Sequence, residues 1–290
     1  MCSRAPFLVG LLSRPMQSMP LSQHLSGDIL RRLRDHGHVI HLVTRRDVAQ
    51  RYRGSVLGIG WMVVSPLLML AIFTFVFSVI FQVRWGQELE STLAFGIVLY
   101  CGLIVHQFVA ECLTRAPGLL LAFPSYIKNV VFPVETLGFV IAGSAAVGFL
   151  LNFGVLVAAH ILLLGWPPAT IFLAPLVVLP MMIFSMFVIW SLAALGIYVR
   201  DLSQITQFLT IILMFMSPIF YPLDAVPDQF RWVLELNPMA FTIEQLRAVV
   251  IFGEIPNLGW TLFAVFIACV AARLGLAFFM RLRVGFADVL

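Results

Sequence analysis

The sequence predicts an all-α polytopic membrane protein. We expect six transmembrane helices, an N-terminal amphipathic interfacial helix, and two short re-entrant outer half-helices before the last span. The composition excludes a soluble globular domain, because 61% of the residues are hydrophobic and only 11% are charged, whereas soluble domains carry about 25% charged residues. The mean hydropathy is +1.01. The run from Trp61 to Phe81 has 21 residues without a formal charge, and as a helix it would measure about 30 Å, the thickness of a bilayer's hydrocarbon core.

Residues 1–27 are expected to form a flexible extension, and residues 28–58 an amphipathic helix in the cytoplasmic interface. Apolar residues recur there at helical spacing, for example at Ile29 and Leu33, and Gly37 is a point where the helix could break in two. Seven arginines share the segment: Arg31, Arg32, Arg34, Arg45, Arg46, Arg51 and Arg53. A basic amphipathic helix is typical of a membrane surface, although arginines that only anchor the first span would give a similar pattern.

The transmembrane domain is expected over residues 59–285. Its spans are placed at about 60–82, 93–114, 139–164, 170–199, 204–222 and 258–280. The fourth apolar stretch is long, so we expect it to tilt or to kink at Pro175 and Pro180. Arg273 lies late in the sixth span, where a long side chain can reach the interface.

The distribution of basic residues predicts the orientation. With six spans both termini lie on one side, and that side holds 15 of the 18 lysines and arginines, leaving Arg84, Arg231 and Arg247 on the other. Loops rich in lysine and arginine stay in the cytoplasm. We therefore expect both termini to be cytoplasmic.

The outward segment 223–257 is too apolar for an ordinary loop. Two amphipathic stretches, about Asp228–Leu236 and Met239–Phe252, are each too short to span and are separated by Asn237-Pro238. Re-entrant or interfacial half-helices fit this pattern, since irregular backbone at membrane depth is tolerated only against protein or water. We expect an outer gate whose residues are Phe230, Trp232, Asn237, Pro238 and Phe241.

The chain is not expected to be an enzyme. Lys128 is the only lysine and lies in Tyr-Ile-Lys-Asn, so the Gly-Lys-Ser/Thr of a phosphate-binding P-loop is missing. The three histidines of HGHVIH (residues 36–41) have no acidic or cysteine ligand at matching spacing, and we predict no metal site. If the chain performs work, another chain must supply the energy.

Polar side chains inside a span raise a functional question. Glu111 in the second span precedes Arg115 by one helical turn, and we predict a local ion pair between them. Asn152 and His160 in the third span are predicted to hydrogen-bond between helices. The same second span also carries His106 and Gln107.

Aromatic side chains gather in the first and fifth spans. An aromatic-lined path would suit a glycan, because sugar rings stack their C–H faces on aromatic rings. The candidate lining residues are Trp61, Phe73, Phe77, Phe81, Phe208, Phe215 and Tyr221. Ordinary packing and lipid-facing phenylalanine explain the same pattern and are favoured by these residues alone, since phenylalanine is abundant throughout the spans.

Three motifs occur in order along the chain. RRDVAQRYRGSVLGIGWMVVSPLL (residues 45–68) precedes and enters the first span, FPSYIKNVVFPVE (residues 123–135) follows the second, and Tyr198-Val-Arg-Asp is followed by Ser217-Pro218 and Asn237-Pro238. Together with the six-span layout, they resemble the membrane subunits of ABC-2-type exporters that move lipid-linked polysaccharides. The resemblance covers about residues 40–285.

The resemblance implies a homodimer in the bacterial inner membrane that works with two copies of a cytoplasmic ABC ATPase subunit. That partner would bind ATP and magnesium, and this chain would hold no cofactor and bind no nucleic acid. The 115–137 loop would dock on the ATPase through Phe123, Pro124, Lys128, Phe132, Pro133 and Glu135. Arg45, Arg46, Arg51 and Arg53 would meet the pyrophosphate of an undecaprenyl-linked glycan, and the first and fifth spans would line the channel.

The resemblance favours lipopolysaccharide O-antigen as the exported glycan. VLGIGW (residues 56–61) is closest to the O-antigen and teichoic-acid branches, and the arginine-rich composition favours O-antigen export. Export of teichoic acid or capsular polysaccharide is an alternative. An ABC-2 permease for drugs or lipids is another, but it would not need the basic helix. A secondary transporter is disfavoured, because no inverted repeat or mid-membrane carboxylate is found.

Overall fold

The computed structural model describes residues 28–51, 53–80, 92–122 and 134–286, and all regular structure in these ranges is helical. The chain divides into residues 1–37 and residues 38–290. Several predicted features lie outside the described residues: the extension 1–27, and Phe81, Phe123, Pro124, Lys128, Phe132 and Pro133. The Phe77 side chain is likewise not described.

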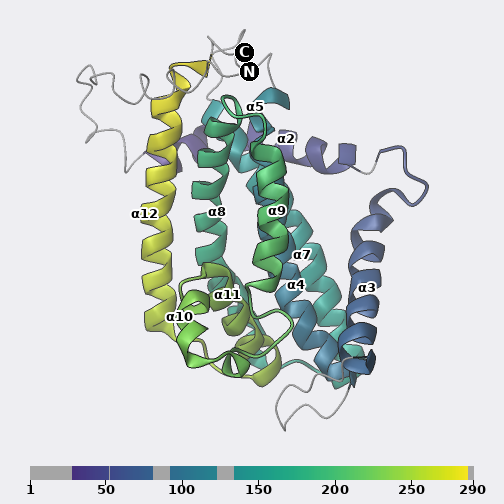
Figure 1. Cartoon of the computed structure of the whole chain (residues 1–290). Coiled ribbons are helices and arrows are strands. Elements are labelled where there is room, and N and C mark those ends of the chain that lie inside the picture. Colours follow the sequence, from purple (N-terminus) through teal and green to yellow (C-terminus); the bar gives the residue numbers. More distant parts are fainter. Residues whose placement is uncertain (1–27, 52, 81–91, 123–133, 287–290) are drawn as a thin grey trace. The chain divides into compact units, whose positions relative to one another are not determined.

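The helices follow the predicted order (Figure 1). They are α2 (Asp28–Arg51), α3 (Trp61–Thr74), α4 (Thr92–Arg115), α5 (Leu119–Ala122), α7 (Leu137–Leu164), α8 (Ala174–Gly196), α9 (Leu202–Phe215), α10 (Asp228–Glu235), α11 (Pro238–Arg247) and α12 (Leu258–Arg283). Helix α3 continues into a π-helical turn, Phe75–Ile80, and α11 into another, Ala248–Phe252.

Four of the expected spans are long and apolar enough to cross a membrane: Ala94–Arg115, Val134–Leu164, Ala169–Gly196 and Leu258–Arg283. The chain is therefore a multi-pass membrane protein. Helices α3 and α9 are apolar but shorter. With its π-helical turn α3 reaches from Trp61 to Ile80, about 30 Å at 1.5 Å per residue. The 14 residues of α9 cover about 21 Å.

The predicted end of the fifth span is wrong. Helix α9 ends at Phe215 rather than at 222, and the chain turns over residues 216–221. Pro218 has no N–H to donate, and its ring disfavours helical backbone at Ser217. The turn is closed by the Tyr221 hydroxyl, which donates to the Phe215 carbonyl at 3.0 Å.

Two expectations about glycine and proline are also wrong. Helix α2 is continuous through Gly37, since one glycine lowers helix stability by only about 1 kcal/mol. It ends at Arg51, before the predicted 58, and Gly54 and Gly58 follow with φ of +90° and +52°. Pro175 lies in the first turn of α8, where no N–H is needed, so it begins this helix instead of kinking it.

The half-helices α10 and α11 form close to the predicted boundaries. Asn237 caps α11, because its side-chain oxygen accepts from the Met239 N–H at 3.0 Å. Pro238 occupies the first helical position, where a fixed φ favours helix. The sequence Asn237-Pro238 thus both ends α10 and starts α11.

The core is built around α4. This helix contacts α3, α7, α8, α9 and α11, and 72% of its most apolar window is buried, more than in any other candidate span. Helix α12 packs along α8. The two lie close at Gly275, where an added Cβ would stand 2.8 Å from the Phe187 Cα.

Replacing Gly275 with Ala should lower the thermal stability of the purified protein. The added methyl would force α12 away from α8, and overpacking of this kind costs about 1–3 kcal/mol. Gly154→Ala is the matched control, because nothing lies within 4 Å of its added Cβ and alanine favours helix. Equal melting temperatures for the two variants would contradict close packing at Gly275.

Candidate functional site

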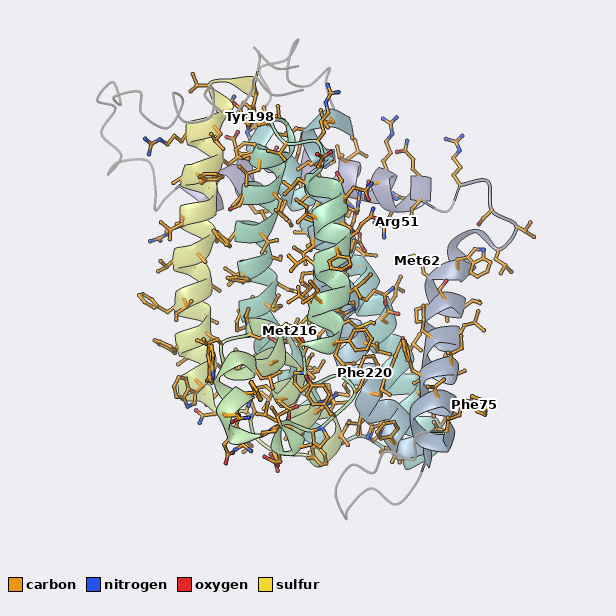
Figure 2. The ribbon with its side chains drawn as sticks, viewed as in Figure 1. Arg51, Met62, Phe75, Tyr198, Met216 and Phe220 are labelled. Carbon is orange, nitrogen blue, oxygen red and sulfur yellow. The ribbon has the colours of Figure 1, made fainter. Side chains whose placement is uncertain are left out.

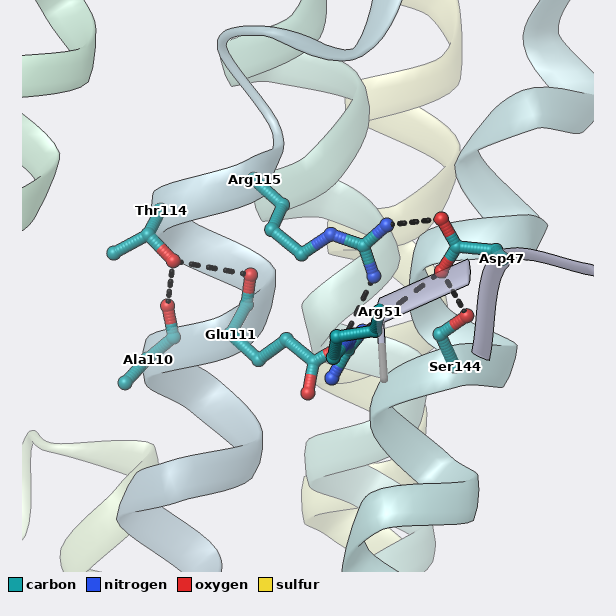
Figure 3. Close-up of polar contacts among 7 residues, drawn as sticks. All are labelled: Asp47, Arg51, Ala110, Glu111, Thr114, Arg115 and Ser144. Atoms are coloured by element: carbon teal, nitrogen blue, oxygen red, sulfur yellow. Dashed lines mark hydrogen bonds and ion pairs between the residues drawn. The ribbon is translucent and has the colours of Figure 1, made fainter. Parts of the chain in front are cut away.

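An ion-pair cluster joins α2, α4 and α7 (Figure 3). It consists of Asp47 and Arg51 from α2, Glu111 and Arg115 from α4, and Ser144 from α7. Asp47 accepts from the Arg115 guanidinium and from the Ser144 hydroxyl, each at 2.6 Å. Glu111 Oε1 accepts from Arg115 Nη1 at 3.0 Å and also from Arg51 Nη2. The predicted Glu111–Arg115 pair is confirmed, and it is part of a larger network.

Helical periodicity explains the arrangement. Each carboxylate precedes an arginine by four residues, which puts the two side chains on one face of their helix. The two pairs face each other, so each carboxylate lies between two guanidinium groups; Arg51 Nη2 is 3.8 Å from Asp47 Oδ2. The side chains of Glu111 and Asp47 are 16% and 19% exposed, and partial burial weakens screening by salt.

Small residues of α7 allow α2 to come close. Thr44 lies one turn before Asp47, and its side chain is buried against α7. A Cβ at Gly143 would stand 3.2 Å from the Thr44 side chain. Gly143 and the neighbouring Ser144 therefore form the surface on which this part of α2 rests.

A polar cavity of about 160 Å³ lies next to the cluster, between α3, α4 and α7. Its polar lining groups are Arg51, Ser65, Gln107, Glu111 and Asn152. Asn152 bonds across to α4, since its Oδ1 accepts from the Tyr100 hydroxyl at 3.1 Å and its Nδ2 donates to Gln107 at 3.3 Å. The predicted inter-helix role of Asn152 is confirmed.

The corresponding prediction for His160 is wrong. Its Nδ1 bonds at 3.0 Å to the carbonyl of Gly165, the residue that directly follows α7, and not to another helix. Gly165 has φ of +91°, so the chain turns back at the end of α7 and brings this carbonyl within reach of the ring. His106, by contrast, bonds between helices, with Nε2 donating to the Thr210 carbonyl of α9 at 2.9 Å.

The four arginines of the predicted substrate entrance have different environments. All four residues are exposed, and the Arg51 side chain, which is 31% exposed, is bonded to Glu111. Figure 2 shows Arg51 at the end of α2 that is followed by α3. Arg51 is therefore the member of this predicted set that the structure places in the ion-pair cluster.

Two of the predicted channel aromatics, Phe73 and Phe215, contact a common neighbour that was not in the predicted set. Phe220, in the turn after α9, has its ring centroid 5.4 Å from that of Phe73 and 5.8 Å from that of Phe215. Aromatics of α3 and α9 thus share one neighbour, labelled in Figure 2. Trp61, Phe208 and Phe215 are exposed. Whether these rings line a channel stays a prediction.

Glu135 is the one described member of the predicted coupling residues. It is 3% exposed, and its Oε2 accepts from Arg283 Nη1 at 3.0 Å. Its main-chain carbonyl accepts from the Trp190 indole at 2.9 Å. Glu135 therefore connects the start of α7 with α8 and α12, and its part in ATPase docking stays a prediction.

Among the predicted gate residues, Phe230 and Trp232 on α10 are exposed. Asn237 makes the contacts that hold the two half-helices to the turn after α9, because its Nδ2 donates to the Ser217 hydroxyl at 2.9 Å. A role of this segment in gating stays a prediction.

Arg247, predicted to be a charge on the outer side, makes a buried structural contact that the sequence did not reveal. It is fully buried at the end of α11. Its guanidinium donates to the carbonyls of Val98 at 3.1 Å, Pro218 at 2.6 Å and Ile219 at 2.9 Å, and to Glu244 at 2.9 Å. One side chain thus joins α11, α4 and the turn after α9.

The only sequence signal for this contact is Gly102. A Cβ at Gly102 would stand 3.2 Å from Arg247 Nη2 and from the Ile219 Cα. A glycine in the middle of a helix costs stability, and here it leaves the space that the arginine and the turn occupy.

Similarity to known proteins defines the class of this chain. The sequence profile described as "ABC-2 type transporter" matches residues 38–251. The chain belongs to this family of membrane transport subunits.

Three curated relatives share the name "O-antigen export system permease protein RfbA". One from Klebsiella pneumoniae is 26% identical over 251 residues, which cover 86% of this chain and 93% of the relative. A second from the same organism is 25% identical over the same coverage. One from Myxococcus xanthus is 23% identical over 231 residues, 79% of this chain and 86% of the relative.

Replacing Arg247 with Gln should destabilise the protein by about 3–5 kcal/mol, because it leaves buried carbonyls and Glu244 without their donor. Arg231→Gln is the control. Arg231 pairs at 3.3 Å with Asp228, whose side chain is 91% exposed, and such pairs contribute about 1 kcal/mol or less. Thermal unfolding of both variants in detergent measures the difference, and similar melting temperatures would refute the anchoring role.

Proposed function

We propose that this chain is the permease subunit of an ATP-binding-cassette exporter for undecaprenyl-pyrophosphate-linked lipopolysaccharide O-antigen. The observation that carries the proposal is the match to three relatives named O-antigen export permease, along 86% of this chain in two of them and 79% in the third. The family assignment and the four long apolar helices support a transport subunit in a membrane.

The remaining parts of the transporter are proposed from the same family and relatives. Two copies of the chain enclose the path of the glycan through the inner membrane, with both termini in the cytoplasm. Two copies of a separate ABC ATPase bind ATP and magnesium. The 115–137 loop docks on that ATPase. Helix α2 lies in the cytoplasmic interface, and α10 with α11 forms the outer gate.

The exposed arginines on α2 and just after it support an anionic substrate. Arg45 and Arg46 on α2, and Arg53 in the turn that follows it, are exposed, and a guanidinium is suited to phosphate because its donors match two oxygens at once. A permease for uncharged drugs or lipids would not need them. This difference separates the proposal from its main alternative.

Replacing Arg45 and Arg46 together with Gln should impair O-antigen export. Each charge-assisted contact to an anion contributes about 1.5–3 kcal/mol, so losing two should lower substrate affinity by a factor of roughly 10² or more. The measurement is surface O-antigen in cells that depend on this chain, alongside the membrane level of the protein.

Arg200→Gln is the control, an exposed arginine in the connection between α8 and α9. It should leave export unchanged. Normal surface O-antigen in the Arg45/Arg46 variant, at a normal protein level, would mean that these arginines only anchor the first span.

A further inference from the structure

The polar cavity beside the ion-pair cluster is lined by α3, α4 and α7, and the α3 and α4 sides differ in character. On the α3 side lie Trp61, Met62 and Pro66 with the hydroxyl of Ser65, and on the α4 side lie Gln107 and Glu111. Its volume of about 160 Å³ is roughly ten times the minimum space that one water molecule needs. The cavity can therefore hold a polar group larger than a single water.

The polar wall belongs to a membrane span. Gln107 is exposed in the structure and lies eight residues before the end of α4 at Arg115, about 12 Å into the helix. Exposed polar side chains at this depth are costly in lipid and are found where they face a cavity or a substrate path. The wall is thus built for a polar occupant.

Arg51 brings a positive charge to this cavity and is held there by Glu111. The same Glu111 oxygen also accepts from Arg115 at 3.0 Å, and Arg115 is fixed in turn by Asp47 at 2.6 Å. If Arg51 turned to another anion, Glu111 would keep its bond to Arg115. The exchange would leave no carboxylate unpaired. An unpaired carboxylate is the most costly state when charged groups are partly buried.

We propose that the cavity binds a phosphate group of the lipid-linked substrate, and that Glu111 is the carboxylate which the phosphate displaces from Arg51. The inference rests on the proposed function and adds to it a site and a competing residue. Arg51 would hold two phosphate oxygens, while the amide of Gln107 and the hydroxyl of Ser65 donate to others. The apolar wall would contact the hydrocarbon next to the phosphate.

If phosphate displaces Glu111 from Arg51, substitutions of these two residues should have opposite effects on phosphate binding. Glu111→Gln removes the competitor, so binding of undecaprenyl diphosphate should tighten by about fivefold, the upper range for breaking a partly exposed pair. Arg51→Gln removes the ligand's main contact, and binding should weaken by about tenfold or more. If the cluster were only structural, both variants would weaken binding or leave it unchanged.

The experiment measures binding of undecaprenyl diphosphate to the full-length chain in phosphatidylcholine nanodiscs. Asp47→Asn is the matched control, because it removes the same charge from the cluster but its residue does not line the cavity. Because Asp47 lies 3.8 Å from Arg51, farther than Glu111, this variant should tighten binding less than Glu111→Gln. Tightening equal to that of Glu111→Gln would show a general charge effect and overturn the inference, as would unchanged or weaker binding by Glu111→Gln or no binding by the wild type.

Two further arms identify the source of the phosphate. Inorganic diphosphate should bind more weakly than the lipid-linked form, and phosphatidylglycerol added to the nanodiscs should not compete. Equal binding of free diphosphate, or competition by phosphatidylglycerol, would overturn the substrate assignment. Failure of the proposed function is measured separately, in cells that lack this chain and do not export O-antigen. If the proposed function is wrong, adding the wild-type chain will not restore export.

Discussion

The polar groups of α4 determine how its neighbours pack, because a helix at the centre of a membrane bundle must find partners for such groups within the protein. Tyr100 bonds to Asn152 of α7, and His106 bonds to the main chain of α9. The ion-pair cluster attaches α2 to the end of α4, and Arg247 attaches α11 to its Val98 carbonyl. Four other helices therefore take their positions from one.

Arginine is used differently at the two ends of this helix. At one end Arg247 is sealed among main-chain carbonyls, where its fork of donors satisfies acceptors that the turn after α9 cannot pair by itself. At the other end the cluster of two arginines and two carboxylates is partly open, and a polar cavity adjoins it. The buried contact of Arg247 favours a single arrangement of the helices. In the partly exposed cluster each carboxylate has two arginine partners, so one partner can be exchanged while the other stays.

Much of the fold was predictable from the sequence, because the long spans are simple apolar runs and Asn237-Pro238 is a local helix-start signal. The pairing of Glu111 with Arg115 was also predictable, because residues four apart in a helix lie on the same face. Its continuation to Asp47 joins residues 68 positions apart, which no spacing rule relates. Arg247 was misplaced because hydropathy assigns a charge to solvent, while its actual acceptors are carbonyls that every residue carries.

We propose that this chain moves a lipid-linked glycan with energy supplied by a separate ATPase. The most direct test reconstitutes the chain in liposomes with and without that ATPase, and measures ATP hydrolysis together with movement of undecaprenyl-linked O-antigen across the bilayer. Both activities should require both chains, because this chain has no P-loop lysine. ATP hydrolysis by this chain alone, or a complete complex that hydrolyses ATP without moving the glycan, would contradict this proposal.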